Sequence, residues 1–354
     1  MAIKVIHIES GLGNQMLSYC EYLAMKRANP NDDIYIENMI YDIDEAGKSI
    51  CQWNGYELER VFEIKAPNVK SLFTVSEWEN IMEEVNLSKF WEKNWNYPVY
   101  ITRALNKYGL CLENIRGDFE SPGWPRMVNE RHKPLSRRIK DRLERFLPYI
   151  YLQQYVRRRR VEGKIYNYSK DLFLKTDKNV FTGQRLSLKM KGSGIELIED
   201  EIRRTFVFPS IKDNQNEQAM RYIQSHESVA IHARRGDLLG LNYALYATRY
   251  FKKAVGFIKK HTNNPIFFVF CDPDSVEWTK RNANVLGLNT VKDEIHFIDW
   301  NKSMDSFRDM QLMAACKHQI ITSSSFGWWG AWLNTNPNKI TIGPDPWINT
   351  TNYF

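Results

Sequence analysis

The chain of 354 residues contains no long apolar run. The most continuous one, Ile266–Phe270, is far shorter than the ~20 residues that a helix needs to cross a bilayer. The N-terminal segment carries Lys4 and Glu9 within its apolar stretch and then turns glycine-rich, which is not the pattern of a signal peptide. We therefore expect a cytoplasmic protein without a membrane span.

Cysteine is scarce, with five residues in the chain. Their number is odd, they are widely scattered, and no two form a C-x-x-C pair, so neither a disulfide framework nor a zinc site is indicated. We expect reduced, mostly buried thiols at Cys20, Cys51, Cys111, Cys271 and Cys316.

The common nucleotide-binding fingerprints are also missing. Residues 3–8 predict a strand, and GLGNQM at Gly11–Met16 then leads into a helix through Arg27. Met16 breaks the G-x-G-x-x-G pattern, and no Gly-Lys-Ser/Thr follows. The turn can still place the amides of Asn14 and Gln15 at a helix N-terminus, where they would contact a phosphate or a sugar hydroxyl. An ordinary helix cap is the alternative.

The composition, 43% hydrophobic and 26% charged, is typical of a soluble globular protein, and the length suggests two lobes. We place an acceptor-side lobe with an irregular helical insert at residues 1–210 and a donor lobe at 211–354. The topology of residues 38–175 is not predicted. The net charge of +7 favours anionic partners, which include nucleotide sugars, acidic lipids and nucleic acids.

The second lobe shows a regular alternation of strand and helix patterns. Strands are predicted at 229–232, 266–270, 295–298, 319–322 and 340–342, separated by helices near 249–260, 275–285 and 304–317. This alternation is typical of βαβ units, so we predict an α/β fold with a Rossmann-like parallel sheet.

Two of these strands end in groups that bind anions. HARRGD at 232–237 places Arg234 and Arg235 where a strand stops, and paired guanidiniums there can grip a diphosphate. A surface turn neutralised by Asp237 is the alternative. Ser323–Ser325 lie at another strand end and at the start of a helix, which also suits a phosphate. Because both strands belong to the same predicted sheet, the two sites should bracket one diphosphate.

Aspartates follow two further strands. Asp272 and Asp274 form a D-x-D that could hold a divalent metal against a nucleotide diphosphate. Since the arginines already supply positive charge and Pro273 explains a turn, we expect no metal and no cofactor. Asp272 would then contact the base or ribose of the donor, and Asp299 holds a comparable position.

Together these motifs resemble the α-1,2-fucosyltransferases of glycosyltransferase family 11. The likeness rests on GLGNQM at Gly11–Met16, HARRGD at 232–237 and SSSFGWWG at 323–330, in that order. It implies a GT-B-like architecture of two Rossmann-like lobes facing a cleft, GDP-β-L-fucose as donor, inversion at the anomeric carbon, and no metal. The chain departs from the family at Gly327, where a small polar residue is common, and at Leu238, where tyrosine is usual.

The resemblance implies these roles by motif. Arg234, Asn14 and Asp237 would be catalytic, with Arg234 on the diphosphate. The donor-binding residues would be Gly13, Gln15, His232, Arg235, Asp272, Asp299, Ser323, Ser324, Ser325 and Phe326.

We therefore predict transfer of L-fucose to a hydroxyl, in particular the 2-hydroxyl of a galactose-containing oligosaccharide. Glu9 and Asp237 are candidates for the general base. One alternative is a metal-dependent glycosyltransferase using Asp272 and Asp274, and another is a basic carbohydrate- or nucleic-acid-binding protein without activity. We expect no nucleic acid partner. The basic run of Arg157, Arg158, Arg159 and Arg160 is either a solvated segment or a peripheral contact with the inner face of the membrane.

Overall fold

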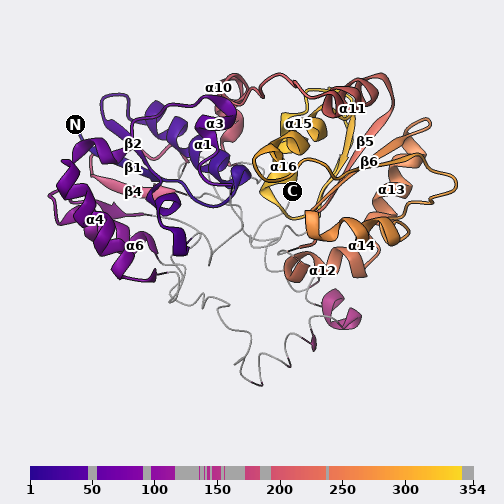
Figure 1. Cartoon of the computed structure of the whole chain (residues 1–354), viewed down its shortest axis with the longest axis horizontal. Coiled ribbons are helices and arrows are strands. Elements are labelled where there is room, and N and C mark those ends of the chain that lie inside the picture. The colour runs from indigo at the N-terminus through magenta and orange to yellow at the C-terminus, as the bar shows by residue number, and fades with distance from the viewer. Residues whose placement is uncertain are drawn as a thin grey trace. The chain divides into compact units, whose positions relative to one another are not determined.

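The computed structural model describes residues 1–46, 54–90, 97–115, 172–183, 193–236 and 239–344, together with positions 135, 139, 142–143, 146–152 and 155. These residues form two compact units. The chain passes from the first unit to the second between Val207 and Phe208, and the described positions between 135 and 155 group with the second unit. Each unit is built on its own parallel β-sheet (Figure 1).

The first unit has four parallel strands in the order β2-β1-β4-β3. They are β1 (Ile3–His7), β2 (Asp33–Glu37), β3 (Glu113–Asn114) and β4 (Val180–Gly183). The helices are α1 (Leu12–Ala28), α3 (Leu58–Phe62), α4 (Val75–Leu87), α6 (Tyr97–Asn106) and α10 (Glu199–Thr205). Short 3-10 helices lie at Met39–Asp42, Val69–Leu72 and Ile195–Ile198. Val5 and Phe181 pack with the apolar faces of α4 and α6 on one side of the sheet, and α1 lies against β1 and β2.

The second unit has five parallel strands in the order β7-β6-β5-β8-β9. They are β5 (Ser228–Ala233), β6 (Ile266–Cys271), β7 (Ile295–Ile298), β8 (His318–Ile320) and β9 (Thr341–Ile342). The helices are α11 (Asn214–Ser225), α12 (Leu239–Ala247), α13 (Tyr250–His261), α14 (Val276–Arg281), α15 (Phe307–Ala315) and α16 (Ser325–Leu333). Two 3-10 helices lie at Pro273–Ser275 and Ser303–Asp305.

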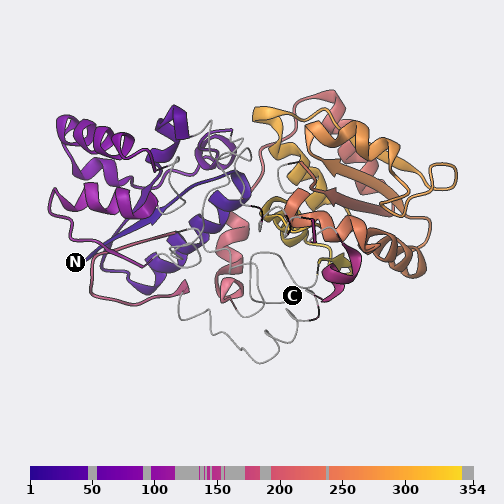
Figure 2. The same cartoon turned by 90° about the horizontal axis from the view of Figure 1, so that it is seen from below.

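Helices cover both faces of the second sheet, which explains its continuous apolar strands. Figures 1 and 2 show α12, α13 and α14 on one side, with α11, α15 and α16 on the other. Alternate residues of β5 point to opposite faces: Val229 and Ile231 pack in the core beneath α13, while Ala230 and His232 face the other layer. The α/β fold predicted from the sequence is confirmed.

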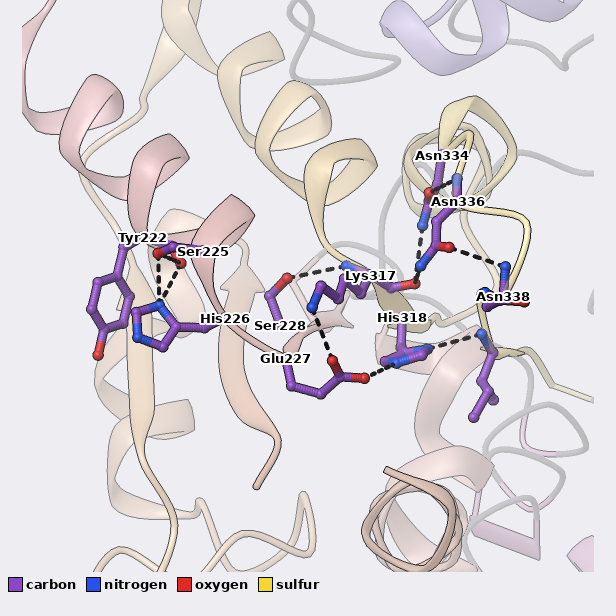
Figure 3. Close-up of polar contacts among 11 residues, drawn as sticks. Tyr222, Ser225, His226, Glu227, Ser228, Lys317, His318, Asn334, Asn336 and Asn338 are labelled. Carbon is purple, nitrogen blue, oxygen red and sulfur yellow. Dashed lines mark hydrogen bonds and ion pairs between the residues drawn. The ribbon is translucent and has the colours of Figure 1, made fainter. Parts of the chain in front are cut away.

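The amino ends of three neighbouring strands are tied together by side chains (Figure 3). Glu227 accepts hydrogen bonds from Nζ of Lys317 (3.0 Å) and from Nε2 of His318 (2.7 Å). Nδ1 of His318 accepts from the backbone N of Ile340 (3.0 Å), which requires the proton on Nε2. Because this network occupies the amino ends of β5, β8 and β9, it leaves the opposite edge of the sheet for a ligand.

Two features of the fold differ from expectation. The polar run at 212–217, next to the lobe boundary placed between residues 210 and 211, contains the start of α11, because Asp213 caps the helix by accepting from the N of Asn216 (2.8 Å). Strand β4 was not predicted. Its φ of +147° at Gly183 and its close approach to the backbone of His7 require glycine there, which shortened the apolar signal.

Candidate functional site

The strand order of the second unit reverses between β5 and β8. The chain builds outward from β5 through β6 to β7 and then returns to the other side of β5 with β8 and β9. Ligands of open α/β sheets bind at such a reversal, outside the carboxyl ends of the strands. Arg234 follows β5 directly and Thr322 follows β8, so the two predicted anion loops lie on either side of this point.

Hydrogen bonds join the two loops into one structure. The backbone N of Arg234 donates to Oγ1 of Thr322 (3.3 Å). Asn242, on α12, donates from Nδ2 to the carbonyl of Arg234 (3.0 Å) and accepts on Oδ1 from the N of Ser323 (3.2 Å). Asn242 is fully buried, so these hydrogen bonds are shielded from water and fix the positions of the two loops relative to each other.

Asp272, at the end of β6, organises the arginine loop. Its carboxylate forms an ion pair with Nη1 of Arg234 and accepts from the backbone N of Arg235 and of Gly236, both at 2.7 Å. A side chain at Gly236 would meet this carboxylate, since a Cβ there would lie 3.1 Å from Cγ of Asp272. Asp272 therefore holds the loop against the neighbouring strand.

The two arginines have different electrostatic surroundings. Arg234 shares its charge with Asp272. The guanidinium of Arg235 instead lies over the indole ring of Trp278, with Cζ 4.0 Å from the ring centroid, and forms no ion pair within the described residues. Arg235 thus presents a cation that is positioned but not neutralised at the strand end.

The imidazole ring of His232 is buried within this site and is neutral. Burial, and secondly the charge of Arg234, lowers the pKa of His232 to about 3. Its Nδ1 lies 3.2 Å from Oγ1 of Thr322, so the ring supports the hydroxyl that receives the Arg234 amide. Gly327 makes room for the ring, because a Cβ at position 327 would lie only 2.8 Å from Cγ of His232. This contact gives a physical reason for glycine where the family commonly has a small polar residue.

Buried hydroxyls lie at the start of α16. Ser323 and Ser324 are 7% and 8% exposed, and Ser324 is the N-cap residue but makes no side-chain cap hydrogen bond. Within the described residues, Oγ of Ser323 and the hydroxyl of Tyr246 are buried without a hydrogen-bond partner. Burial raises the pKa of Tyr246, so its hydroxyl stays protonated and can donate. Ser325 begins the helix, and the ring of Phe326 lies 6.0 Å from that of His232.

Comparison with known proteins supports the resemblance seen in the sequence. Residues 197–351 match the protein family described as glycosyl transferase family 11. An α-1,2-colitosyltransferase of Escherichia coli is 27% identical over 98% of this chain and 93% of its own length. The O-antigen biosynthesis glycosyltransferase WbnK of Escherichia coli is 30% identical over 36% of this chain and 42% of its own length. These matches bear out the resemblance to glycosyltransferase family 11 that the three sequence motifs indicate.

The human galactoside α-(1,2)-fucosyltransferase 1 is 24% identical over 38% of this chain and 39% of its own length. Among solved structures, the α-1,6-fucosyltransferase NodZ soaked with GDP-fucose aligns with a TM-score of 0.43 and 10% identity, covering 94% of this chain and 92% of that one. The matches support a glycosyltransferase that transfers a fucose-like sugar.

Other predicted site residues lie elsewhere in the second unit or outside the described residues. Asp299 follows β7, two strands away from β5, and pairs with Lys280 (2.6 Å). Asp274 is exposed in the turn after β6. No group of three or more His, Cys, Asp or Glu side chains lies together as a metal site in the part of the chain that the structure describes. Asp237 and the run from Arg157 to Arg160 lie outside the described residues. Among the residues that the structure describes, no helix is both long and apolar enough to cross a membrane.

Gly13, Asn14 and Gln15 belong to the first turns of α1, in the first unit. Nε2 of Gln15 donates to the carbonyls of Ser10 and Gly55, both at 2.9 Å, and Oε1 accepts from the N of Glu57 (2.8 Å). These bonds use the whole side-chain amide inside the unit, and the side chain is fully buried. Gln15 holds two loops around the helix start, and its contact with a donor stays a prediction.

The start of α1 faces a carboxylate. The N of Leu12 donates to Oε2 of Glu57 (3.1 Å), and Arg60 pairs with the same carboxyl group (2.7 Å). Burial raises the pKa of Glu57, although Arg60 opposes the shift. Because Glu57 already accepts from the helix N-terminus, α1 is a less favourable phosphate site than the start of α16.

The sequence indicated Glu9 as a candidate base, but not the buried cluster of a histidine and two glutamates to which Glu9 belongs at the end of β1. His7 lies between Glu37, with which it forms an ion pair, and Glu9, whose Oε2 is 3.4 Å from Nε2. Burial alone would lower the pKa of His7, but the two carboxylates outweigh it and the pKa is raised. His7 and Glu37 are paired residues of β1 and β2. Both stand near the end of a stretch of strand pattern in the sequence, and this common position is the signal that could have indicated their contact. The roles of Thr322, Asn242, Tyr246 and Trp278 had no signal in the sequence.

Proposed function

We propose that this protein is a family 11 enzyme that transfers L-fucose from GDP-β-L-fucose to a hydroxyl group of a glycan, in particular the 2-hydroxyl of a galactoside, with inversion at the anomeric carbon. The observation that carries the proposal is the union of the Arg234–Gly236 and Thr322–Ser324 loops at the reversal point of the second sheet. A diphosphate has the negative charge and the acceptor oxygens that the guanidiniums, hydroxyls and amides of these two loops can bind.

The chemistry asked of the site is stabilisation of the leaving group. As the bond between the sugar and the diphosphate breaks, negative charge grows on the phosphate oxygens. Arg235 offers a cation without an ion-pair partner within the described residues, and Arg234 offers one shared with Asp272. The hydroxyls of Ser323 and Tyr246 and the amides at the start of α16 supply further donors. Their preorganisation by Asp272 and Asn242 means that little rearrangement is needed during the reaction.

We propose that no metal takes part, because the Asp272 carboxylate already binds a guanidinium and two backbone amides. Full activity after treatment with EDTA is the expected result. Activity that EDTA abolishes and Mn²⁺ restores would contradict this part of the proposal.

A second donor sugar is supported by one comparison. The α-1,2-colitosyltransferase of Escherichia coli aligns with nearly the whole of this chain. The donor is therefore best tested with GDP-fucose and GDP-colitose side by side, and kcat/KM decides between them. Stabilisation against heat by GDP, but not by UDP, ADP or CMP, is expected with either sugar. Steeply salt-dependent nucleic acid binding without a response to GDP would support a binding protein instead.

Substitution of the arginines tests the site directly. In Arg234→Ala and Arg235→Ala, transfer should fall by about 100-fold or more, because each change removes charge from the leaving group. Arg281→Ala is the matched control, since Arg281 lies on α14 of the same unit and is 79% exposed. Near-normal transfer by a folded Arg234→Ala protein would refute the proposed role.

A further inference from the structure

A groove runs along the open edge of the second sheet. β7 is the last strand on one side of this sheet, and α11 lies beside it. The groove between them has a volume of about 570 Å³, which is in the range of sites for small molecules. Gln215, Gln218 and Tyr222 line it from one face of α11, since they are three and four residues apart, and residues 295–300 form its floor.

Aromatic rings are fixed at both ends of the groove. Near the start of β7, the carboxylate of Glu294 accepts from the hydroxyl of Tyr222 (2.5 Å) and from Nε2 of His296 (2.9 Å). Beyond the end of β7, Nε1 of Trp300 donates to Oδ1 of the buried Asn216 (2.9 Å). All three rings are half-buried, so each keeps an exposed surface. Because the rings are already held in place, a ligand that packs on them pays little to order them.

The polar groups of the groove carry no net charge. Its lysine and its aspartate, Lys280 and Asp299, pair with each other (2.6 Å). Gln215 and Gln218 are exposed, and a side-chain amide both donates and accepts. In the described sheet β7 pairs with β6 alone, so the outer side of β7 adds backbone N–H and C=O groups. Such groups beside aromatic rings suit a neutral ligand that carries hydroxyls on an apolar frame.

We propose that the groove between α11 and β7 binds a neutral oligosaccharide. The C–H faces of sugar rings pack on Tyr222, His296 and Trp300, and the sugar hydroxyls exchange hydrogen bonds with the amides. A second hollow of about 480 Å³ shares Gln218 and Tyr222 with the groove, so the surface has room for more than one sugar ring.

The groove leads toward the donor loops. β7 and β6 are parallel neighbours, so the residues after β7 come next to those after β6, where Asp272 holds the arginine loop. A glycan whose reacting hydroxyl lies at that loop can therefore continue along β7. The choice of a glycan as the occupant rests on the proposed function.

An extended peptide is a poorer occupant of the groove. Peptides that add to the edge of a sheet are held by a ladder of backbone hydrogen bonds. β7 has only four residues, which limits such a ladder, and short edge strands are a common means of preventing it.

NMR titration of the full chain with a neutral galactose-containing hexasaccharide tests the proposal. The probe is the indole N–H signal of Trp300, which is assigned as the signal that Trp300→Phe removes. This signal should shift when the hexasaccharide is added, with or without GDP. The double variant Gln215→Ala, Gln218→Ala should raise the dissociation constant by about fivefold or more, because two amides no longer bond to the sugar.

The matched control is Gln224→Ala with Asn284→Ala, which removes two exposed amides of the same unit that do not line the groove. It should bind the hexasaccharide like the wild type, and stabilisation by GDP should be unchanged in both double variants. Sugar binding at Trp300 in a protein that transfers no sugar would support the groove site and refute the proposed function.

Three results would each overturn the proposed sugar site. They are an unchanged Trp300 signal in the presence of the hexasaccharide, equal dissociation constants for the two double variants, and a larger shift with a capped hexapeptide of alternating Val and Thr than with the sugar.

Discussion

The guanidinium carbon of Arg235 lies 4.0 Å from the centre of the Trp278 ring, and this contact distinguishes Arg235 from Arg234. Arg234 is held by the Asp272 carboxylate and contributes a charge that is already partly compensated. An aromatic face positions Arg235 without cancelling its charge. The strand end therefore offers a binding site of net positive charge even though an aspartate lies within it.

Trp278→Leu should weaken GDP binding by about threefold to thirtyfold, the range expected when a cation loses an aromatic face. The KM for the donor should rise with it, and titration calorimetry with GDP measures the effect. Phe307→Leu is the control, because its ring also lies under an arginine, with Cζ of Arg308 at 4.6 Å, but it belongs to α15 away from this loop. Equal GDP affinities in the two variants would count against a positioning role for Trp278.

Gly327→Ala should lower the free energy of unfolding by about 1–3 kcal/mol, since the new methyl group would lie within 2.8 Å of the His232 ring and force it to move. GDP affinity should fall as well, because His232 supports Thr322. Urea unfolding and GDP titration measure the two effects.

Gly256→Ala provides the comparison, since Gly256 is also helical but has no atom within 4 Å of an added methyl group. That variant should be unchanged or more stable by up to about 1 kcal/mol. Two equally stable alanine variants would mean that the His232 ring is not confined.

His232 predicts a stability that falls in acid. Its pKa in the folded protein is about 3, below the ordinary 6.5, so between these values the unfolded chain binds a proton that the folded chain does not. The contribution of the neutral His232 ring to the free energy of unfolding is complete above pH ~6.5 and is lost as the pH falls toward ~3.

His232→Gln should therefore flatten the dependence of urea unfolding on pH within this window, although the variant will be less stable at neutral pH. His261→Gln, at the exposed end of α13, is the control and should keep the wild-type slope. An unchanged slope in His232→Gln would show that another group controls acid unfolding.

Substitutions of Gln15 and Asn14 should have different effects, with Gln15 needed for the stability of the first unit and Asn14 for catalysis. Gln15→Leu removes three hydrogen bonds and leaves the carbonyls of Ser10 and Gly55 without this donor, so unfolding should become easier by about 2–4 kcal/mol. Asn14→Ala should instead lower kcat with little loss of stability, as its predicted catalytic role requires. Calorimetric melting and steady-state kinetics on both proteins test this division, and a stable but inactive Gln15→Leu variant would reverse it.

Much of the second unit could be predicted from the sequence, because its signals are local. Strands β6 and β7 are apolar runs bounded by turns and were placed almost to the residue. The first unit was harder, since β3 and β4 have only two and four residues, and β4 ends in a glycine whose role is contact with β1.

The sequence by itself determined that this protein has parallel α/β architecture and that arginines and serines end two of its strands, because alternation and strand ends are properties of neighbouring residues. Only the tertiary structure decided that Asp272 neutralises Arg234 and not Arg235, and that Asn242 joins the two loops. These contacts connect residues that are 38, 8 and 81 positions apart, and they depend on which strands become neighbours in the sheet. The physical reason is that the strand order, which no local pattern records, brings distant side chains within hydrogen-bonding distance.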